Sequence, residues 1–110
     1  MIKDLLTSHC IPCEGGVAPL KGTALAPYRT QVSPEWKVSD DELEIRRVFK
    51  FKDFAGALAF TNRIGAIAEQ EGHHPDLGVS WGKLDVRLST HAIGGLSEND
   101  FILARKIDAL

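Results

Sequence analysis

Two parts of the chain alternate apolar and polar residues with the two-residue period of a β-strand. The first, over residues 36–51, is a short strand candidate and a turn followed by a longer strand, whose apolar face consists of Leu43, Ile45, Phe49 and Phe51. The second, over residues 77–90, turns near Gly82 between two alternating strands, whose apolar positions are Leu77, Val79 and Trp81, then Leu84, Val86 and Leu88. Because such short connections permit only antiparallel pairing, each part predicts a hairpin.

Residues between and after the hairpins have the three- and four-residue spacing of amphipathic helices. The spacing predicts a long helix after the N-cap candidate Asp53, with one face formed by Phe54, Leu58, Thr61, Ile64 and Ala68. Gly72 is suited to end this helix, because glycine enters the left-handed conformation without a steric penalty. Ser97 and Asp100 have the spacing of a capping box and predict the start of a last helix.

The order hairpin, helix, hairpin, helix predicts an α+β fold of two layers. We expect a four-stranded antiparallel sheet covered on one face by two to three helices. The 110 residues fit a single domain, 1–110, whose irregular N-terminal arm, 1–34, holds four of the five prolines and one short helix around 22–32. The edge strands of so small a sheet have unpaired backbone groups that can bond another copy of the chain, which favours a homodimer or homotetramer.

The balance of charged residues indicates which kinds of binding partner are unfavourable. The chain has 13 Lys and Arg against 15 Asp and Glu, a net charge of -2, which argues against nucleic acid and against a basic membrane-binding surface. No apolar run reaches the roughly 20 residues of a membrane span, and the first residues are too short and too charged for a signal peptide. A cytoplasmic location is therefore expected.

Cys10 and Cys13 are close enough in sequence for a redox dithiol or for half of a zinc site. A thioredoxin-like motif expects a long helix directly after it, whereas glycines and Pro19 follow here. No second Cys-x-x-Cys is present. We therefore favour a structural role, with redox or metal chemistry as the alternative.

Three of the four histidines, His73, His74 and His91, lie within 19 residues, near Glu69 and Asp100. Imidazole titrates near neutral pH, so two converging histidines can serve as acid and base. Pro75 holds His74 extended beyond the helix end, and the strand parity places His91 on a polar face near a strand end. Glu69, one turn before His73, could accept a hydrogen bond from a histidine ring nitrogen and fix its tautomer. Two alternatives stay open here: unreactive surface histidines, and a zinc or iron site.

The spacing of these residues resembles the signature of the pterin-4a-carbinolamine dehydratase family. The matching elements are Glu69, His73-His74-Pro75, Trp81, His91 and Asp100, with further likeness at 51–54, 62–63 and 89–101. The resemblance covers roughly Trp36 to the C-terminus. One departure is Gly72, because some relatives carry an acidic residue immediately before the histidine pair.

The resemblance implies a hydro-lyase that converts 4a-hydroxytetrahydrobiopterin to quinonoid dihydropterin, with no metal and no organic cofactor. It implies that His73 and His91 are the acid/base pair and that His74 binds the pterin and holds charge. Substrate-binding residues would be the three histidines with Pro75, Ser89 and Thr90, supported by Glu69 and Asp100. The implied pathway recycles tetrahydrobiopterin for aromatic amino acid hydroxylases. The alternative is a non-catalytic dimerisation cofactor or assembly factor of the same fold.

Overall fold

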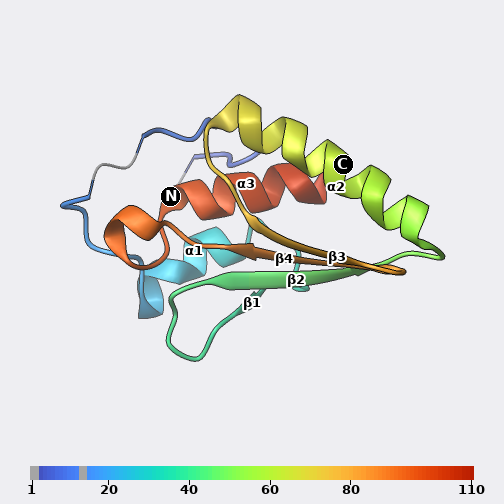
Figure 1. Ribbon diagram of the computed structural model, residues 1–110. Helices are drawn as coiled ribbons and strands as arrows, with labels where there is room; N and C mark the ends of the chain where they lie inside the picture. The colour runs from blue at the N-terminus through green and yellow to red at the C-terminus, as the bar shows by residue number, and fades with distance from the viewer. Residues whose placement is uncertain (1–2, 13–14) are drawn as a thin grey trace.

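Four antiparallel strands form the single sheet of the computed structural model, which describes residues 3–12 and 15–110 (Figure 1). Their order across the sheet is β1, β2, β4, β3, and their bounds are Lys37–Val38 (β1), Ile45–Lys50 (β2), Asp76–Ser80 (β3) and Lys83–Leu88 (β4). The two hairpins predicted from the alternation are β1–β2 and β3–β4, and β2 pairs with β4 between them.

Helices cover one face of this sheet, so the predicted α+β two-layer fold is confirmed (Figure 1). The helical segments are the 3-10 turns Gly22–Leu25 (η1) and His91–Ile93 (η2) and the α-helices Ala26–Arg29 (α1), Phe54–Glu71 (α2) and Glu98–Asp108 (α3). α2 and α3 pack against each other, and α2 also contacts β3 and β4. None of the described helices could cross a membrane.

The parity of β4 separates the core from the outer face of the sheet. Leu84, Val86 and Leu88 are fully buried beneath the helices, whereas Arg87 is exposed. Trp81 departs from its predicted place on the apolar face of β3. It lies in the β3–β4 turn beside Gly82 and is 73% exposed, because the strand ends at Ser80.

Both predicted ends of α2 are confirmed. The Asp53 carboxylate accepts a hydrogen bond from the Gly56 amide at 2.8 Å, and Gly72 ends the helix with φ of 66°. This left-handed residue turns the chain away from the helix axis. The two histidines after it therefore lie in a short loop that leads into β3.

The buried face of α2 differs in part from the predicted one. Ile64 and Ala68 are buried as expected, but Phe54 and Leu58 are 45% and 43% exposed. In the first turns of α2, Ala57 and Phe60 face the core instead. The Phe60 ring packs on Phe49 and Phe51, with centroid distances of 4.9 and 5.5 Å. The aromatic contacts with β2 fix the helix rotation, which spacing alone does not specify.

The N-terminal segment predicted as an irregular arm contributes to the core. Leu5 and Leu25 have exposed fractions of 0% and 1% and belong to the same buried cluster as the sheet residues. The short helix predicted around 22–32 is present as η1 and α1. Residues 3–12 therefore have a fixed path over the domain rather than a loose one, and this path leads to the site.

Candidate active site

The loop after α2 and the end of β4 meet at one open cavity of about 440 Å³. α2 and Gly72 deliver His73, His74 and Pro75 to one side of it. β4 and the 3-10 turn η2 deliver Ser89, Thr90 and His91 to the other. All six residues predicted to bind substrate line this cavity, although they come from segments 14 or more residues apart.

His73 is anchored by a buried carboxylate. Its Nε2 lies 2.6 Å from Oδ1 of Asp100, and the two side chains are 12% and 0% exposed. An ionised carboxylate only accepts hydrogen bonds, so Nε2 carries the hydrogen. The other ring nitrogen, Nδ1, is then left with its lone pair when the ring is neutral, which suits it to accept a proton.

Asp100 also ties the site to the start of α3. Its Oδ2 accepts from the Thr90 hydroxyl at 2.9 Å and from the Ser97 amide at 3.0 Å. The Ser97–Asp100 capping box was predicted from the sequence and is confirmed. One carboxylate thus caps the helix, holds Thr90 and orients His73, because its two oxygens have room for several donors.

Glu69 bonds a histidine ring, but the ring is that of His74 and not that of His73. The Glu69 Oε2 lies 2.5 Å from Nε2 of His74. The left-handed turn at Gly72 changes the direction of the chain before the pair, so the helical spacing no longer places position 73 above position 69. Both partners are largely exposed, with side-chain exposures of 78% for Glu69 and 62% for His74.

Glu71 has no hydrogen bond with His73, His74 or His91. Its carboxylate is 3% exposed and accepts from the Cys10 amide at 2.8 Å, with His9 Nδ1 at 3.1 Å and Lys106 Nζ at 3.6 Å. Burial acts to raise the pKa of Glu71, but these hydrogen bonds and the lysine charge outweigh it and hold the pKa below its ordinary value.

His91 and Thr90 have contrasting environments. His91 is exposed at the start of η2, and its ring has no hydrogen-bond partner among the described residues. Thr90 is 4% exposed, and its hydroxyl is engaged by Asp100 and by Ser97 Oγ at 2.6 Å. His91 is therefore free to exchange protons in the cavity, whereas the Thr90 hydroxyl mainly supports the site.

Several cavity residues were not found from the sequence. They are Ile11, Pro12, Gly72, Asp76, Ala92 and Asn99. Asp76 and Ala92 adjoin residues of the motif, and this adjacency could have indicated them. Ile11 and Pro12 lie more than 60 residues before the histidines in a segment without periodicity, so no sequence pattern connects them with the site.

The described residues bear on the metal and thiol alternatives. Within residues 3–12 and 15–110, no group of three His, Cys, Asp or Glu is arranged to hold a metal ion. Burial, followed by the Glu71 charge, raises the pKa of the Cys10 thiol to about 12, which leaves little reactive thiolate. Cys13 lies outside the described residues.

The geometry defines a small α+β protein in which His73 and His91 line one open cavity, and comparison with known proteins gives its family. A family model described as Pterin 4 alpha carbinolamine dehydratase matches residues 18–110, and the chain belongs to this family. Dehydration is the activity of a hydro-lyase, so the chain is classed among the hydro-lyases.

Curated relatives match almost the whole chain. A protein of Alkaliphilus metalliredigens is 49% identical over 107 residues, which are 97% of this chain and 96% of the relative. A protein of Halorhodospira halophila is 50% identical over 107 residues, 97% of each. Both carry the name "Putative pterin-4-alpha-carbinolamine dehydratase".

Solved structures share the fold. A "transcriptional coactivator/pterin dehydratase" from Brucella melitensis is 33% identical, with a TM-score of 0.75 over 83% of this chain and 96% of that chain. A pterin dehydratase-like protein described as a RuBisCO assembly factor in the alpha-carboxysome is 22% identical, with a TM-score of 0.59 over 68% of this chain and 87% of that chain. At that identity the second likeness concerns the fold alone.

Proposed function

We propose that the protein dehydrates 4a-hydroxytetrahydrobiopterin to quinonoid dihydropterin and water by histidine general acid/base catalysis. The observation that carries the proposal is the meeting of His73 and His91 at one cavity, with His73 held by the buried Asp100 carboxylate. Membership of the dehydratase family supports the same substrate class. No metal or organic cofactor enters the proposed reaction.

His73 is the base in this mechanism. With Nε2–H bonded to Asp100, Nδ1 takes the proton from N5 of the pterin. The N5–H electron pair forms the N5=C4a double bond, and the C4a–O bond breaks. The Asp100 carboxylate stabilises the imidazolium that results, because opposite charges at this separation favour the charged ring.

His91 is the acid. In its protonated form it gives a proton to the departing 4a-oxygen, which leaves as water, so the substrate loses one hydroxyl and one proton in total. The turnover leaves His73 protonated and His91 neutral. Both rings border a cavity that is open to solvent, so water can return each to its starting state.

The remaining cavity residues bind and orient the pterin. A volume of about 440 Å³ lies in the range usual for small-molecule sites. The bonded side chains of His74 and Glu69 place an imidazole at the solvent-exposed edge of the cavity, and Pro75 and Ser89 line its side. Together they would hold the flat polar ring so that N5 meets His73 and the 4a-oxygen meets His91.

The test is to follow freshly generated 4a-hydroxytetrahydrobiopterin by stopped-flow absorbance with the purified protein. His73→Ala and His91→Ala should each lower kcat by about 10²- to 10⁴-fold, the usual contribution of a general acid or base. His9→Ala is the matched control, because His9 is the one histidine that does not line the cavity, and its kcat should stay near wild type. Near-normal turnover by both site variants would refute the assignment.

The biological setting follows from this chemistry and belongs to the same proposal. The enzyme would recycle tetrahydrobiopterin in the cytoplasm for an aromatic amino acid hydroxylase, as a homodimer or homotetramer. Gel filtration with light scattering checks the oligomer. The alternative, a non-catalytic dimerisation or assembly factor, has support from the coactivator role in the description of the Brucella structure. Absence of turnover with tight co-purification of a protein partner would favour that alternative.

A further inference from the structure

The N-terminal arm borders the cavity of the histidine site. Ile11 and Pro12 line it, and both are exposed. The family model begins only at residue 18, so this part of the lining lies outside the segment that the family pattern defines. The arm therefore adds a wall to a site whose other side chains come from the matched segment.

Asn99 brackets the backbone of Ile11 at two points. Its Oδ1 accepts from the Ile11 amide at 3.1 Å, and its Nδ2 donates to the Ile11 carbonyl at 2.7 Å. Asn99 itself is 6% exposed, and both bonds are partly buried. A side-chain amide that pairs with both the N–H and the C=O of one residue fixes its position and direction, much as a neighbouring strand would.

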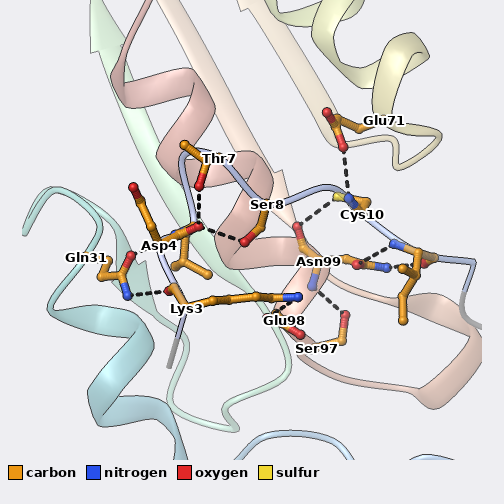
Figure 2. A network of polar contacts seen from close by, with 12 residues as sticks. Lys3, Asp4, Thr7, Ser8, Cys10, Gln31, Glu71, Ser97, Glu98 and Asn99 are labelled. Carbon is orange, nitrogen blue, oxygen red and sulfur yellow. Dashed lines mark hydrogen bonds and ion pairs between the residues drawn. The ribbon is translucent and has the colours of Figure 1, made fainter. Parts of the chain in front are cut away.

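Glu71 holds the preceding residue of the arm. Its Oε1 accepts from the Cys10 amide, and Figure 2 shows this bond beside the contacts of Asn99. Further contacts fasten the arm upstream, because Lys106 Nζ donates to the Leu6 carbonyl at 2.9 Å and the Leu5 amide donates to Gln31 at 2.9 Å. Residues 5–11 of the arm are thus bonded at several points, and these bonds hold the backbone of Ile11 beside the cavity.

The two anchors adjoin the residues that place the base. Glu71 is two positions before His73, and Asn99 is one position before Asp100. The arm is consequently fastened to both partners of the His73–Asp100 pair through their own chain neighbours. Its position relative to the base is therefore fixed by short, partly buried connections.

We propose that Ile11 and Pro12 form an apolar wall against which one face of the bicyclic pterin ring system packs, and that Asn99 and Glu71 are positioning residues for that wall. The inference rests on the proposed dehydratase function and adds residues that bind the ring system of its substrate. The Ile11 side chain is 68% exposed, so it has apolar surface to bury when a ring enters the cavity. A wall of this kind contributes to binding and excludes water, but it moves no proton.

Ile11→Ser and Val17→Ser form the matched pair for the test. Both residues are exposed to a similar degree, 68% and 65%, but Val17 does not line the histidine cavity. Ile11→Ser should raise KM for the 4a-hydroxytetrahydropterin and Kd for 7,8-dihydrobiopterin by about three- to tenfold with kcat unchanged. Val17→Ser should keep both values, and Ile11→Leu, which keeps the apolar volume, should stay near wild type.

Asn99→Ala tests the positioning role. It should reproduce the KM and Kd increase of Ile11→Ser while leaving the pH profile of kcat unchanged, because the histidines and Asp100 remain in place. If the wild-type protein turns over the substrate and the Ile11→Ser and Val17→Ser variants have identical KM and Kd, the proposal of an apolar wall is wrong. The proposed dehydratase function would not be affected by that result. A wild-type protein without turnover would instead overturn the proposed function, and the wall with it.

Discussion

The carboxylate of Asp100 and the imidazole of His73 lie 2.6 Å apart, although 27 residues separate them in the sequence. The same carboxylate completes the capping box of α3. The position of the His73 ring is therefore set by the start of α3. The Asp100 carboxylate thus contributes to the stability of α3 and, in the proposed mechanism, to catalysis. Substitutions can separate these two contributions.

Asp100→Asn should lower kcat by about tenfold to a thousandfold, because a neutral amide no longer stabilises the protonated ring or fixes its tautomer. It should also reduce the free energy of unfolding by about 1–2 kcal/mol through the weakened cap. Steady-state kinetics and thermal unfolding measure the two effects. Asp108→Asn is the control: Asp108 is a buried carboxylate of the same helix, bonded to Trp36 and Arg47 away from the cavity.

The control variant should lose stability without losing kcat. If Asp100→Asn behaved in the same way, with kcat unchanged, then the contact with His73 would have no part in the chemistry, and the assignment of His73 as the base would lose its main structural support.

The pair formed by Glu69 and His74 should affect binding more than turnover. Both side chains are largely exposed, so solvent screens their interaction and the pair stabilises the fold little. Glu69→Gln should change kcat and Tm only slightly, and His74→Ala should raise KM more than it lowers kcat. A loss of kcat in His74→Ala as large as in His73→Ala would show that the two rings have similar roles. Stopped-flow kinetics over a range of pterin concentrations separates these outcomes.

Local signals along the chain were sufficient for the elements but not for their partners. Asp53, Gly72 and the Ser97 capping box act through neighbouring backbone groups, so their roles could be predicted from nearby residues. The partner of His73 depends on how α3 packs beside the loop after α2, and sequence spacing suggested Glu69 as the partner of a histidine ring. The Asp100 side chain was expected mainly to cap the helix, and it does so while also bonding the ring.

The contacts of the N-terminal arm with the cavity could not be predicted from the sequence for a second reason. The arm's contacts with Asn99 and Glu71 join residues 61 to 89 positions apart and use backbone amides, which are the same for every non-proline residue. No hydrophobic period marks such a segment. The exposed Phe54 and Leu58 illustrate the converse case, in which a regular spacing was present but packing selected another face of the helix.

Glu71 should make the stability of the protein depend on pH. Its carboxyl has a pKa below the ordinary value of 4.5, so the ionised form stabilises the fold above about pH 4.5, and this contribution is lost as the pH falls through the lowered native pKa. Glu71→Gln should therefore cost about 1–3 kcal/mol near neutral pH and progressively less in acid. Thermal unfolding as a function of pH measures the difference.

Glu69→Gln is the matched control for this experiment, because Glu69 lies on the same helix but is 78% exposed. Its Tm should follow that of the wild type at every pH. A Glu71→Gln defect of equal size in acid and at neutral pH would mean that shape, rather than charge, holds the arm.

Cys10 should react slowly with thiol reagents in the folded protein. Burial and the nearby Glu71 carboxylate raise its pKa to about 12 from an ordinary value of 9.0, so the reactive thiolate is scarce near neutral pH. In a Cys13→Ser background, alkylation of Cys10 by iodoacetamide should be slower by about a hundredfold or more than in the denatured chain. Mass spectrometry of timed samples measures the rates. Equal alkylation rates in the folded and the denatured chain would mean that the Cys10 thiol is reactive, and would favour a redox role for it.

Ile64→Ala and Leu58→Ala should differ sharply in their effect on stability, although both remove an aliphatic side chain from α2. Ile64 is fully buried, so its loss leaves a cavity and should cost about 2–5 kcal/mol. Leu58 is 43% exposed, and its loss from a single folded chain should cost less than about 1 kcal/mol. Urea denaturation at two protein concentrations tests both values. A larger, concentration-dependent cost for Leu58→Ala would mean that a second copy covers this face of the helix, as the expected homo-oligomer requires.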